Sequence, residues 1–296
     1  MPELAEVAYY CRQWQGGVGL EVERIQTHPA ARIYREIPAA AIRRGLAGRT
    51  FLGGRTHGKR MLFEFSGGAW LGLHLGMTGK LCTAPPDHIP AKHEHLVLSL
   101  ATLSLVFSDS RMFGKLSLDL VDTGDPPTWW TELPPQPLDR RFTKSLVHSF
   151  ARRFPKTPLK TLLLDQRAFP GIGNWMADEI CWQLRLTPSA PVATATGPQL
   201  DGVWKTTRRV SRVAMDVIGT DWGDLPNTWL MNHRWRDGGT CPRRGCRTEL
   251  VRADLRGRTT CWCPRCQTSD RGRNNDRARD ERSTQIRAMS ADSPRS

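Results

Sequence analysis

Apolar side chains recur at helical spacing at the start of the chain. Leu4, Val7, Cys11 and Trp14 follow one another at intervals of three or four residues, which predicts a helix over residues 3–15. At this period one face of a helix is continuous and apolar. The first element of the fold is therefore expected to begin almost at the start of the sequence.

Between about residues 20 and 120 the pattern changes to short apolar runs, some of them alternating with polar positions. Residues 60–65 and 70–75 are two such runs, and each predicts a strand. Residues 96–100 and 103–107 flank a two-residue break, which predicts a hairpin or tight turn. Several short strands at this spacing indicate a sandwich or a barrel.

A proline-rich stretch separates this half of the chain from a helical half. Five prolines fall within residues 122–138, which indicates a stiff linker. Apolar positions then return to helical spacing, and we expect helices around 159–164, over 174–186 and over 200–218, the last one capped by Gly219. Residues 268–296 are rich in Arg, Asp, Ser and Asn and nearly free of apolar side chains, so we expect a disordered tail there.

The charge balance narrows the class of partner. The 296 residues include 43 Lys and Arg against 29 Asp and Glu, a formal net charge of +14, which favours a polyanionic partner. The hydrophobic fraction of 39% is sufficient for a packed core. No run approaches 18 apolar residues, and the first residues lack the basic and apolar segments of a signal peptide. We therefore expect an intracellular protein without a membrane span.

The cysteines indicate a metal site. Five of the eight crowd into residues 241–266, and disulfides are disfavoured inside the cell. Two short-spaced pairs can offer four thiolates to one tetrahedral zinc ion. The expected ligands are Cys241, Cys246, Cys263 and Cys266. Cys261 should point to the opposite face of a short strand from Cys263. The three isolated cysteines are expected in the core, namely Cys11, Cys82 and Cys181.

The N-terminus offers a nucleophile. Initiator Met is normally removed before a small residue such as Pro2, and removal exposes a secondary amine. An α-amine has a pKa of about 8, and such an amine can attack an electrophilic carbon to form an iminium. Glu3 follows directly, where a carboxylate can act as general acid or base. Taken alone, both residues are more typical of an ordinary helix start.

Three further segments could contact an anion. Residues 55–60 form a basic turn that would present Lys59 to a phosphate or a leaving group, although a solvated hairpin tip has the same pattern. Glycines at 171 and 173 precede a helix, where backbone N–H groups bind anions, and Asn174 would add a donor or merely cap the helix. Three arginines between the cysteine pairs suit phosphates, or form a solvated basic face. They are Arg252, Arg256 and Arg258.

Taken together and in this order, these features resemble the formamidopyrimidine-DNA glycosylase/endonuclease VIII family of DNA glycosylases. The resemblance runs from residue 2 to about 267 and rests on residues 1–7, 74–79 (HLGMTG), 109–114 (DSRMFG) and 171–174 (GIGN), and on the cysteine ribbon. It implies an α+β multidomain fold with an N-terminal helix plus β-sandwich, a helix–two-turns–helix domain and a C-terminal zinc ribbon. The DNA would run in the cleft between the domains.

The implied domain boundaries follow from the resemblance and the linker. The expected segments are 1–122 for the helix and catalytic sandwich, 123–142 for the proline-rich linker, 143–225 for the DNA-binding helix–two-turns–helix domain, 226–267 for the zinc ribbon and 268–296 for the tail.

The resemblance also implies roles for individual residues. Pro2 would be the Schiff-base nucleophile at C1′ of the damaged nucleotide, and Glu3 the proton donor and acceptor. Lys59 would assist β-elimination, and Arg258 would serve δ-elimination and hold phosphate. The implied DNA contacts are His93, Arg111, Asn174, Lys160 and Lys156. The residues that would fill the gap left by the extruded nucleotide are Met77, Arg111 and Phe113, with the last as a wedge.

The sequence departs from the family pattern in several places. Ala5 and Ser110 stand where proline is usual, Met112 replaces a second arginine, and the first cysteine spacing is four residues instead of two. Only residues 220–240 separate Gly219 from the first cysteine ligand. Bacterial formamidopyrimidine-type relatives usually carry a longer segment there, which holds a loop that caps flipped 8-oxoguanine. We therefore expect a weakened preference for that lesion.

The sequence thus predicts a bifunctional DNA glycosylase and abasic-site lyase that acts on double-stranded DNA as a monomer in the cytoplasm or nucleoid. The expected lesions are formamidopyrimidine-type purines, with 8-oxoguanine and oxidised pyrimidines as further candidates. One alternative is a zinc-dependent protein that binds damaged DNA without catalysis, and another is a lyase mainly for abasic sites. Joint presence of Pro2, Glu3, Lys59 and Arg258 favours an enzyme, because a purely DNA-binding protein has no need of a free proline amine.

Overall fold

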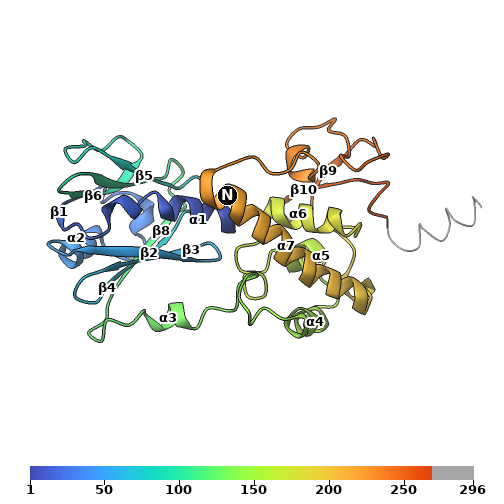
Figure 1. The fold of residues 1–296 in the computed structure, drawn as a ribbon, viewed down its shortest axis with the longest axis horizontal. Coiled ribbons are helices and arrows are strands. Elements are labelled where there is room, and N and C mark those ends of the chain that lie inside the picture. The colour runs from blue at the N-terminus through green and yellow to red at the C-terminus, as the bar shows by residue number, and fades with distance from the viewer. Residues whose placement is uncertain (269–296) are drawn as a thin grey trace, which may run out of the picture.

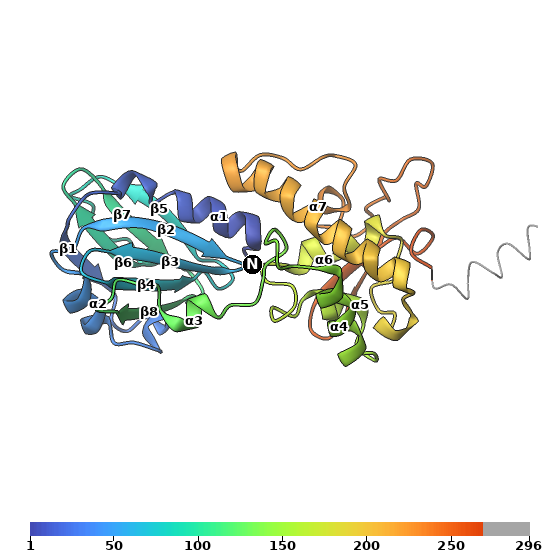
Figure 2. The same ribbon diagram turned by 60° about the horizontal axis from the view of Figure 1, so that its bottom comes forward.

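The computed structural model describes residues 1–268, and the tail expected to be disordered lies outside these residues apart from residue 268. The described chain forms two lobes (Figures 1 and 2). The β lobe comprises residues 1–120, and the helical lobe comprises residues 144–268. The N-terminus lies at the junction between the two lobes in both views.

Two four-stranded antiparallel sheets build the β lobe, as the spacing of its apolar runs predicts. The first has the order β1-β6-β7-β5, with strands at Val22–Thr27, Glu94–Leu100, Ser104–Ser108 and Lys80–Ala84. The second has the order β2-β3-β4-β8, with strands at Phe51–His57, Arg60–Phe65, Ala69–His74 and Lys115–Leu120. The predicted hairpin is confirmed, since Leu98 of β6 pairs with Leu105 of β7. The core between the sheets includes Phe63, Leu73 and Phe107.

Helices cover the edges of the sandwich and fill the second lobe. Those of the β lobe are α1 (Leu4–Arg12), η1 (Gln15–Gly17), η2 (Arg32–Tyr34) and α2 (Ala39–Leu46). Those that follow are α3 (Thr128–Thr131), α4 (Lys144–Arg153), α5 (Leu159–Leu163), α6 (Asn174–Gln183), η3 (Val192–Thr194), α7 (Gly197–Asp221) and η4 (Leu230–Asn232). A short antiparallel hairpin completes the fold, with β9 at Val251–Asp254 and β10 at Thr259–Trp262.

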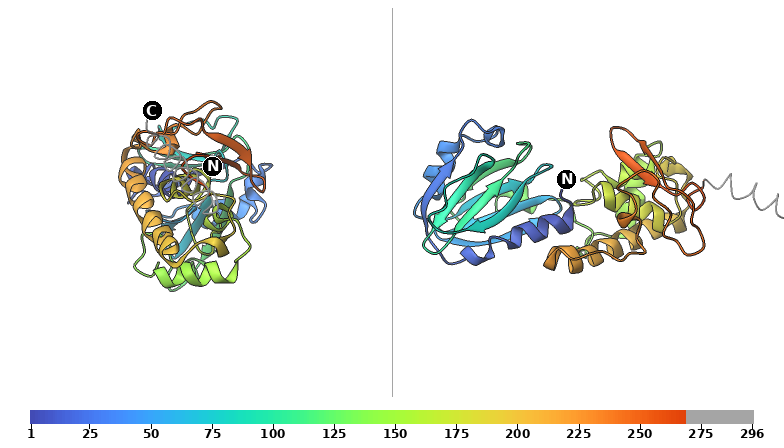
Figure 3. Two further views of the ribbon diagram at one scale, coloured as in Figure 1. Left: turned by 90° about the vertical axis from the view of Figure 1, so that its right-hand side faces the viewer. Right: turned by 90° about the horizontal axis from the view of Figure 1, so that it is seen from above.

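Helix α1 takes part in the cores of both lobes. Val7 and Cys11 are buried among the residues of the sandwich, while Leu4 and Ala5 are buried among those of the helical lobe. The division runs along the helix: its first residues reach the helical lobe, and the residues that follow lie against the sandwich. The right-hand view of Figure 3 shows α1 along the sandwich, with the end of α7 beside it.

The proline-rich segment is more than a spacer, because it packs against the β lobe. Its short helix α3 places the indole N–H of Trp129 at 3.0 Å from Asp119 Oδ2, to which it donates a hydrogen bond. Further along, the backbone carbonyl of Pro134 lies 2.7 Å from the His57 ring nitrogen Nε2. The segment therefore reaches the turn between β2 and β3 in a fixed position.

Two predictions about α6 and α7 need correction. Helix α6 ends at Gln183 rather than at residue 186. Helix α7 continues through Gly219 to Asp221, and its cap is Trp222, which adopts a left-handed φ of 55°. Gly219 instead lies within the last turn of α7 and faces α1, where a Cβ would make only ordinary contacts, such as 3.6 Å to the Ala5 carbonyl oxygen.

The isolated cysteines and the helices give two further outcomes. Cys11 and Cys181 are buried as expected, but Cys82 is exposed, so its prediction as a core residue was wrong. Cys82 lies on β5, an edge strand of its sheet, where the burial pattern leaves its face open to solvent.

Within residues 1–268, none of the helices combines the length and the apolar character that crossing a membrane requires.

Candidate active site

The carboxylate of Glu3 lies at the N-terminus of α6, across the junction between the lobes. Glu3 directly precedes α1, and it is only 2% exposed. Its Oε2 accepts hydrogen bonds from the backbone N–H groups of Gly173 (2.8 Å) and Met176 (3.2 Å), and its Oε1 accepts one from Trp175 (2.8 Å). The first N–H groups of a helix have no partner inside the helix. A residue of one lobe therefore caps a helix of the other.

Glycine is required where this carboxylate meets the turn. A Cβ at Gly173 would lie 2.3 Å from the carboxyl carbon of Glu3. The sequence predicted that the glycines before this helix would expose N–H groups to an anion. In the folded chain, the carboxyl group of Glu3 already occupies part of that anion site.

Burial changes the acidity of Glu3. Removal from water, together with the nearby Glu6 carboxylate, raises the pKa of Glu3 to about 7, against the opposing effects of Lys59 and of the α6 N–H groups. Glu6 is held beside it, since its carboxylate accepts hydrogen bonds from the Glu3 N–H (3.2 Å) and the Trp175 indole N–H (2.9 Å). Glu3 can therefore hold a proton at neutral pH and release it within the same pH range.

A cavity of about 450 Å³ opens in front of Glu3 between the two lobes. Five residues that the resemblance assigns to catalysis, DNA binding or gap filling line it, namely Glu3, Lys59, Met77, Asn174 and Arg258. Met1 also lines the cavity, and Pro2 stands between Met1 and Glu3 in the chain. The fold thus brings together residues from the chain start, the β2–β3 turn, two loops and the β9–β10 hairpin.

Lys59 is fixed at this cavity by a contact between the lobes. It follows Gly58 in the turn between β2 and β3, and its Nζ donates a hydrogen bond to the backbone carbonyl of Ile172 at 2.8 Å. Burial lowers the pKa of Lys59, while the charge of Glu3 partly opposes this effect. The predicted alternative of a solvated hairpin tip is therefore wrong.

His74 and Trp235 are among the lining residues to which the sequence analysis gave no role. His74 lies at the end of β4 and within the quoted HLGMTG motif, so a signal for it was present. Burial and nearby cations lower its pKa to about 4. The N–H of Gly76 donates to Nδ1 at 3.0 Å, so the neutral ring carries its proton on Nε2 and can donate it. No sequence pattern singled out Trp235.

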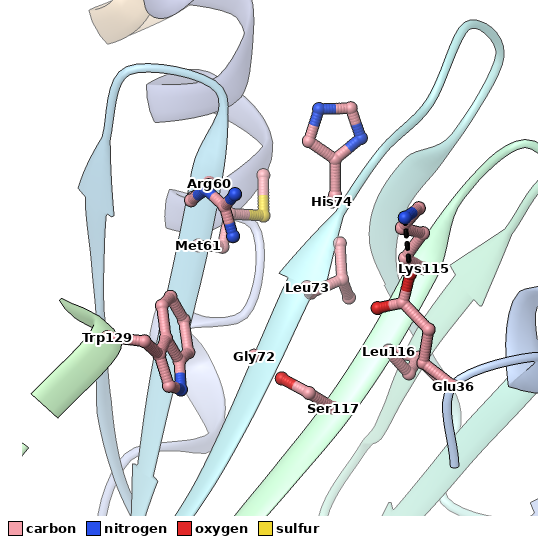
Figure 4. Close-up of a pocket in the computed structure, with 10 residues that line it drawn as sticks. All are labelled: Glu36, Arg60, Met61, Gly72, Leu73, His74, Lys115, Leu116, Ser117 and Trp129. Carbon is pink, nitrogen blue, oxygen red and sulfur yellow. Dashed lines mark hydrogen bonds and ion pairs between the residues drawn. The ribbon is translucent and has the colours of Figure 1, made fainter. Parts of the chain in front are cut away.

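His74 also borders a second cavity, which lies beside the sheet of β3, β4 and β8 (Figure 4). In that view Lys115 forms an ion pair with the neighbouring Glu36 at one side of the cavity. Arg60 lies with its guanidinium carbon 5.7 Å from the ring centre of Trp129. These cations already interact with other side chains of the protein, and Glu3 and Lys59 do not line this cavity, so the candidate site is the one between the lobes.

The β9–β10 hairpin carries Arg258 to the cavity. Arg256 and Gly257 both have positive φ (54° and 76°), as a tight two-residue turn of the hairpin type requires. Arg258 follows this turn and is exposed. The carbonyl of Thr259 accepts a hydrogen bond from Asn174 Nδ2 at 2.9 Å. Because that amide carries two hydrogens, Asn174 can fix the hairpin and still donate to a ligand.

The gap-filling residues lie on two loops that one buried carboxylate joins. Asp109 accepts hydrogen bonds from the Thr78 hydroxyl (2.6 Å), the Arg111 N–H (3.2 Å) and the Gly114 N–H (2.7 Å). These three hydrogen bonds to Asp109 place Met77 beside the loop that bears Phe113. Both Met77 and Phe113 are exposed apolar side chains. The guanidinium carbon of Arg111 lies 4.8 Å from the centre of the Phe113 ring.

Lys160 requires a correction. The resemblance predicted that it contacts DNA, but it is only 1% exposed. Its Nζ lies 2.7 Å from Asp178 Oδ1 and donates hydrogen bonds to the Thr259 carbonyl and the Thr260 hydroxyl, both at 2.9 Å. Asp178 also pairs with Arg234 at 2.6 Å. Lys160 therefore joins α5 and α6 to the β9–β10 hairpin from inside the protein.

The two other expected basic contacts, His93 and Lys156, are exposed, and neither lines the cavity. His93 is joined to the gap-filling loop, since its carbonyl accepts a hydrogen bond from the Asp109 N–H at 2.9 Å. Lys156 lies between α4 and α5.

The four expected cysteines form one cluster. The sulfur atoms of Cys241, Cys246, Cys263 and Cys266 all lie within 4.8 Å of one another. Sulfur atoms around one tetrahedral zinc ion would lie about 3.8 Å apart, given zinc–sulfur bonds of about 2.3 Å. The Trp182 indole N–H lies 3.3 Å from the Cys241 sulfur, so a donor is already aimed at the cluster. The four residues could therefore hold one metal ion, and Cys261 stands outside them.

Family models match most of the chain. The formamidopyrimidine-DNA glycosylase N-terminal domain matches residues 1–116, and the formamidopyrimidine-DNA glycosylase H2TH domain matches residues 133–222. A formamidopyrimidine-DNA glycosylase of Carboxydothermus hydrogenoformans is 30% identical over 276 residues, which cover 90% of this chain and all of that protein. One from Thermus thermophilus is 33% identical over 285 residues, covering 90% of this chain and 98% of its own length.

Solved structures of the Lactococcus lactis enzyme have the same fold. One, not covalently bound to DNA with an abasic site, has a TM-score of 0.78 at 25% identity and covers 90% of this chain and 99% of its own. Another, in complex with DNA that contains an oxidised pyrimidine, has a TM-score of 0.78 at 25% identity and covers 90% of this chain and 100% of its own.

The buried position of Lys160 leads to a prediction about stability. Lys160→Met should lower the free energy of unfolding by about 3 kcal/mol, because removal of one partner leaves Asp178 buried with a single cation. Lys156→Met makes the same change at an exposed lysine and should alter stability by less than about 0.5 kcal/mol. Urea denaturation of both variants measures the difference. Equal stability of the two variants would contradict the ion pair.

Proposed function

This chain belongs to the formamidopyrimidine-DNA glycosylase family, and from that membership we propose that it excises oxidised bases from double-stranded DNA and then cleaves the abasic strand in the same site. Its general activity is that of a DNA glycosylase in the repair of damaged DNA. The observation that carries the finer proposal is the buried Glu3, whose pKa is about 7, next to Pro2 in a cavity that Lys59 and Arg258 also line.

In the first step Pro2 replaces the damaged base. Once Met1 is removed, the Pro2 nitrogen forms a bond to C1′ of the sugar as the bond from C1′ to the base breaks. The departing base takes the proton that Glu3 holds. The Glu3 carboxylate then accepts the proton from the Pro2 nitrogen and passes it to O4′ as the sugar ring opens. The products are the free base and an iminium between Pro2 and C1′.

The iminium makes strand cleavage possible. Its positive charge acidifies the hydrogen on C2′, and loss of that proton expels the 3′ phosphate. A second elimination expels the 5′ phosphate. Lys59 and Arg258 line the cavity in which these eliminations would take place. Fixed cations stabilise the negative charge that develops on the departing phosphates. Water then hydrolyses the iminium and frees Pro2.

The DNA contacts follow from the same arrangement. We assign phosphate binding to Asn174, Arg258 and His93, with Lys156 at the periphery. Met77, Arg111 and Phe113 would enter the space that the extruded nucleotide leaves, since an enzyme that reacts at C1′ must take the nucleotide out of the duplex. Apolar side chains inserted into a base step offset part of the unstacking cost. The hydrogen bonds to Asp109 hold the two loops that carry these three residues next to each other.

We also propose that the cysteine cluster binds zinc. The four sulfurs and the donor from Trp182 suit that ion. Zinc would supply no chemistry to the reaction but would hold the ends of the β9–β10 hairpin, whose turn presents Arg258.

The proline mechanism predicts a covalent intermediate. Borohydride added during reaction with abasic-site DNA should reduce the iminium and leave the protein joined to DNA through Pro2. Gel electrophoresis detects the adduct, and mass spectrometry of the N-terminal peptide locates it. An N-terminal extension converts the Pro2 nitrogen to an amide, so the extended protein should give no adduct. An undiminished yield with the extended protein would refute the role of Pro2.

The acidity of Glu3 predicts the pH dependence of base excision. Excision requires a proton on Glu3 and an unprotonated Pro2 amine, whose pKa is about 8. Single-turnover excision should therefore pass through a maximum between the two pKa values and decline above it, because Glu3, with a pKa of about 7, has lost its proton there. Glu3→Gln should slow excision by about 10²- to 10⁴-fold and remove this decline. Borohydride trapping with abasic-site DNA checks that the variant is folded. A variant that kept the wild-type pH profile would contradict the assignment.

The cysteine cluster predicts one zinc ion per chain, which metal analysis measures. Cys246→Ser should lose the ion and weaken abasic-site DNA binding, because the hairpin with Arg258 loses its anchor. Cys261→Ser alters a buried cysteine of the same hairpin that stands outside the cluster. It should keep the metal. Equal zinc content in both variants would show that the ligand assignment is wrong.

A further inference from the structure

An exposed tryptophan lies at the candidate site, in the short segment between α7 and the cysteine cluster. Trp235 belongs to residues 222–240, between α7 and the first cysteine of the cluster. It is 59% exposed and lines the same cavity as Glu3, Lys59 and Arg258. A single exposed aromatic side chain is ordinary on a protein surface, but this one lines the cavity in which the proposed reaction takes place.

Trp235 is held by a buried support. Arg234 is buried, and its Nη2 forms an ion pair with Asp178 Oδ2 at 2.6 Å. Asp178 is itself fixed by Lys160 and by the N–H of Cys261. The guanidinium carbon of Arg234 lies 4.8 Å from the ring centre of Trp235. This cation–π contact and the buried ion pair place the indole at the cavity while much of its surface remains open.

The chemistry of such a platform fits a nucleobase. Every base has a π-face, and a base that leaves the duplex loses the stacking of its neighbours. An indole beside the cavity of Glu3 offers a replacement. On the basis of the proposed function, we propose that Trp235 stacks on the extruded base and so favours planar, unsaturated lesions over ring-saturated ones.

Stacking and hydrogen bonding have different consequences for specificity. Contacts to base edges require a particular pattern of donors and acceptors, whereas stacking accepts any flat ring. A short segment that offers an indole therefore selects for shape, and oxidised purines and aromatic oxidised pyrimidines share that shape. A saturated pyrimidine has a puckered ring and loses part of this contact.

The test compares two lesions of similar size. Duplexes that differ only in 5-hydroxyuracil, which is planar, or dihydrouracil, which is saturated, are used for single-turnover excision. Trp235→Ala should slow excision of 5-hydroxyuracil by about tenfold to a hundredfold, the range expected for one base–aromatic stack. It should slow dihydrouracil excision much less and leave cleavage of abasic-site DNA unchanged, because that substrate has no base.

Two further variants separate stacking from general damage to the protein. Trp235→Phe keeps an aromatic face and should recover most of the excision rate. Trp222→Ala removes another exposed tryptophan, which packs against Tyr9 and Tyr10 and does not line the cavity. It should keep the wild-type ratio of base excision to abasic-site cleavage.

Each other outcome has a definite meaning. If Trp235→Ala slows abasic-site cleavage as much as base excision, Trp235 contacts the duplex and the proposal is overturned. If both lesions are affected equally, or neither is, the indole does not select flat bases and the proposal also fails. If the wild-type protein cleaves neither damaged nor abasic DNA, the proposed function itself fails, and the role of Trp235 falls with it.

Discussion

The buried carboxylate of Glu3 joins the start of the chain to the N-terminus of α6, and the arrangement of the site depends on this contact. Burial of a carboxyl group is costly, but three backbone N–H groups and the helix dipole offset part of that cost. The part of the cost that is not offset raises the pKa of Glu3 to about 7. A contact that joins the two lobes thus also produces a group able to exchange a proton at neutral pH.

A second buried carboxylate connects several elements within the helical lobe, as Glu3 connects the two lobes at their junction. Asp178 of α6 pairs with Lys160 and Arg234, and through them it fixes the β9–β10 hairpin and the segment with Trp235. Both carboxylates are tied to the same short helix, since Glu3 caps its first turn and Asp178 belongs to its second. Helix α6 therefore sets the relative positions of the proton donor, the arginine of the hairpin and the exposed indole.

Much of the fold could be predicted because it depends on local pattern. The strand at residues 60–65 was predicted with the bounds that β3 has, because its apolar positions and flanking turns are all close in sequence. Gly219 was misread as a cap because its contact with Ala5 lies more than 200 residues away in the chain. The family resemblance implied that Lys160 contacts DNA, and the sequence holds no sign that this lysine is buried. Lys160 is in fact buried and pairs with Asp178, a contact that no local pattern reveals.

In the candidate site, too, some residues could be predicted from the sequence and others could not. The family resemblance pointed to Glu3, Lys59, Asn174 and Arg258, which line one cavity, and to four cysteines, which form a separate cluster. Trp235 belongs to no such motif, and the shortness of its segment suggested only that a cap was missing. A loop that loses length can keep a role in base recognition if one large, rigid side chain replaces many small contacts. The cost of ordering one indole with two rotatable bonds is low, and the contact with the buried Arg234 restrains the ring before any substrate arrives.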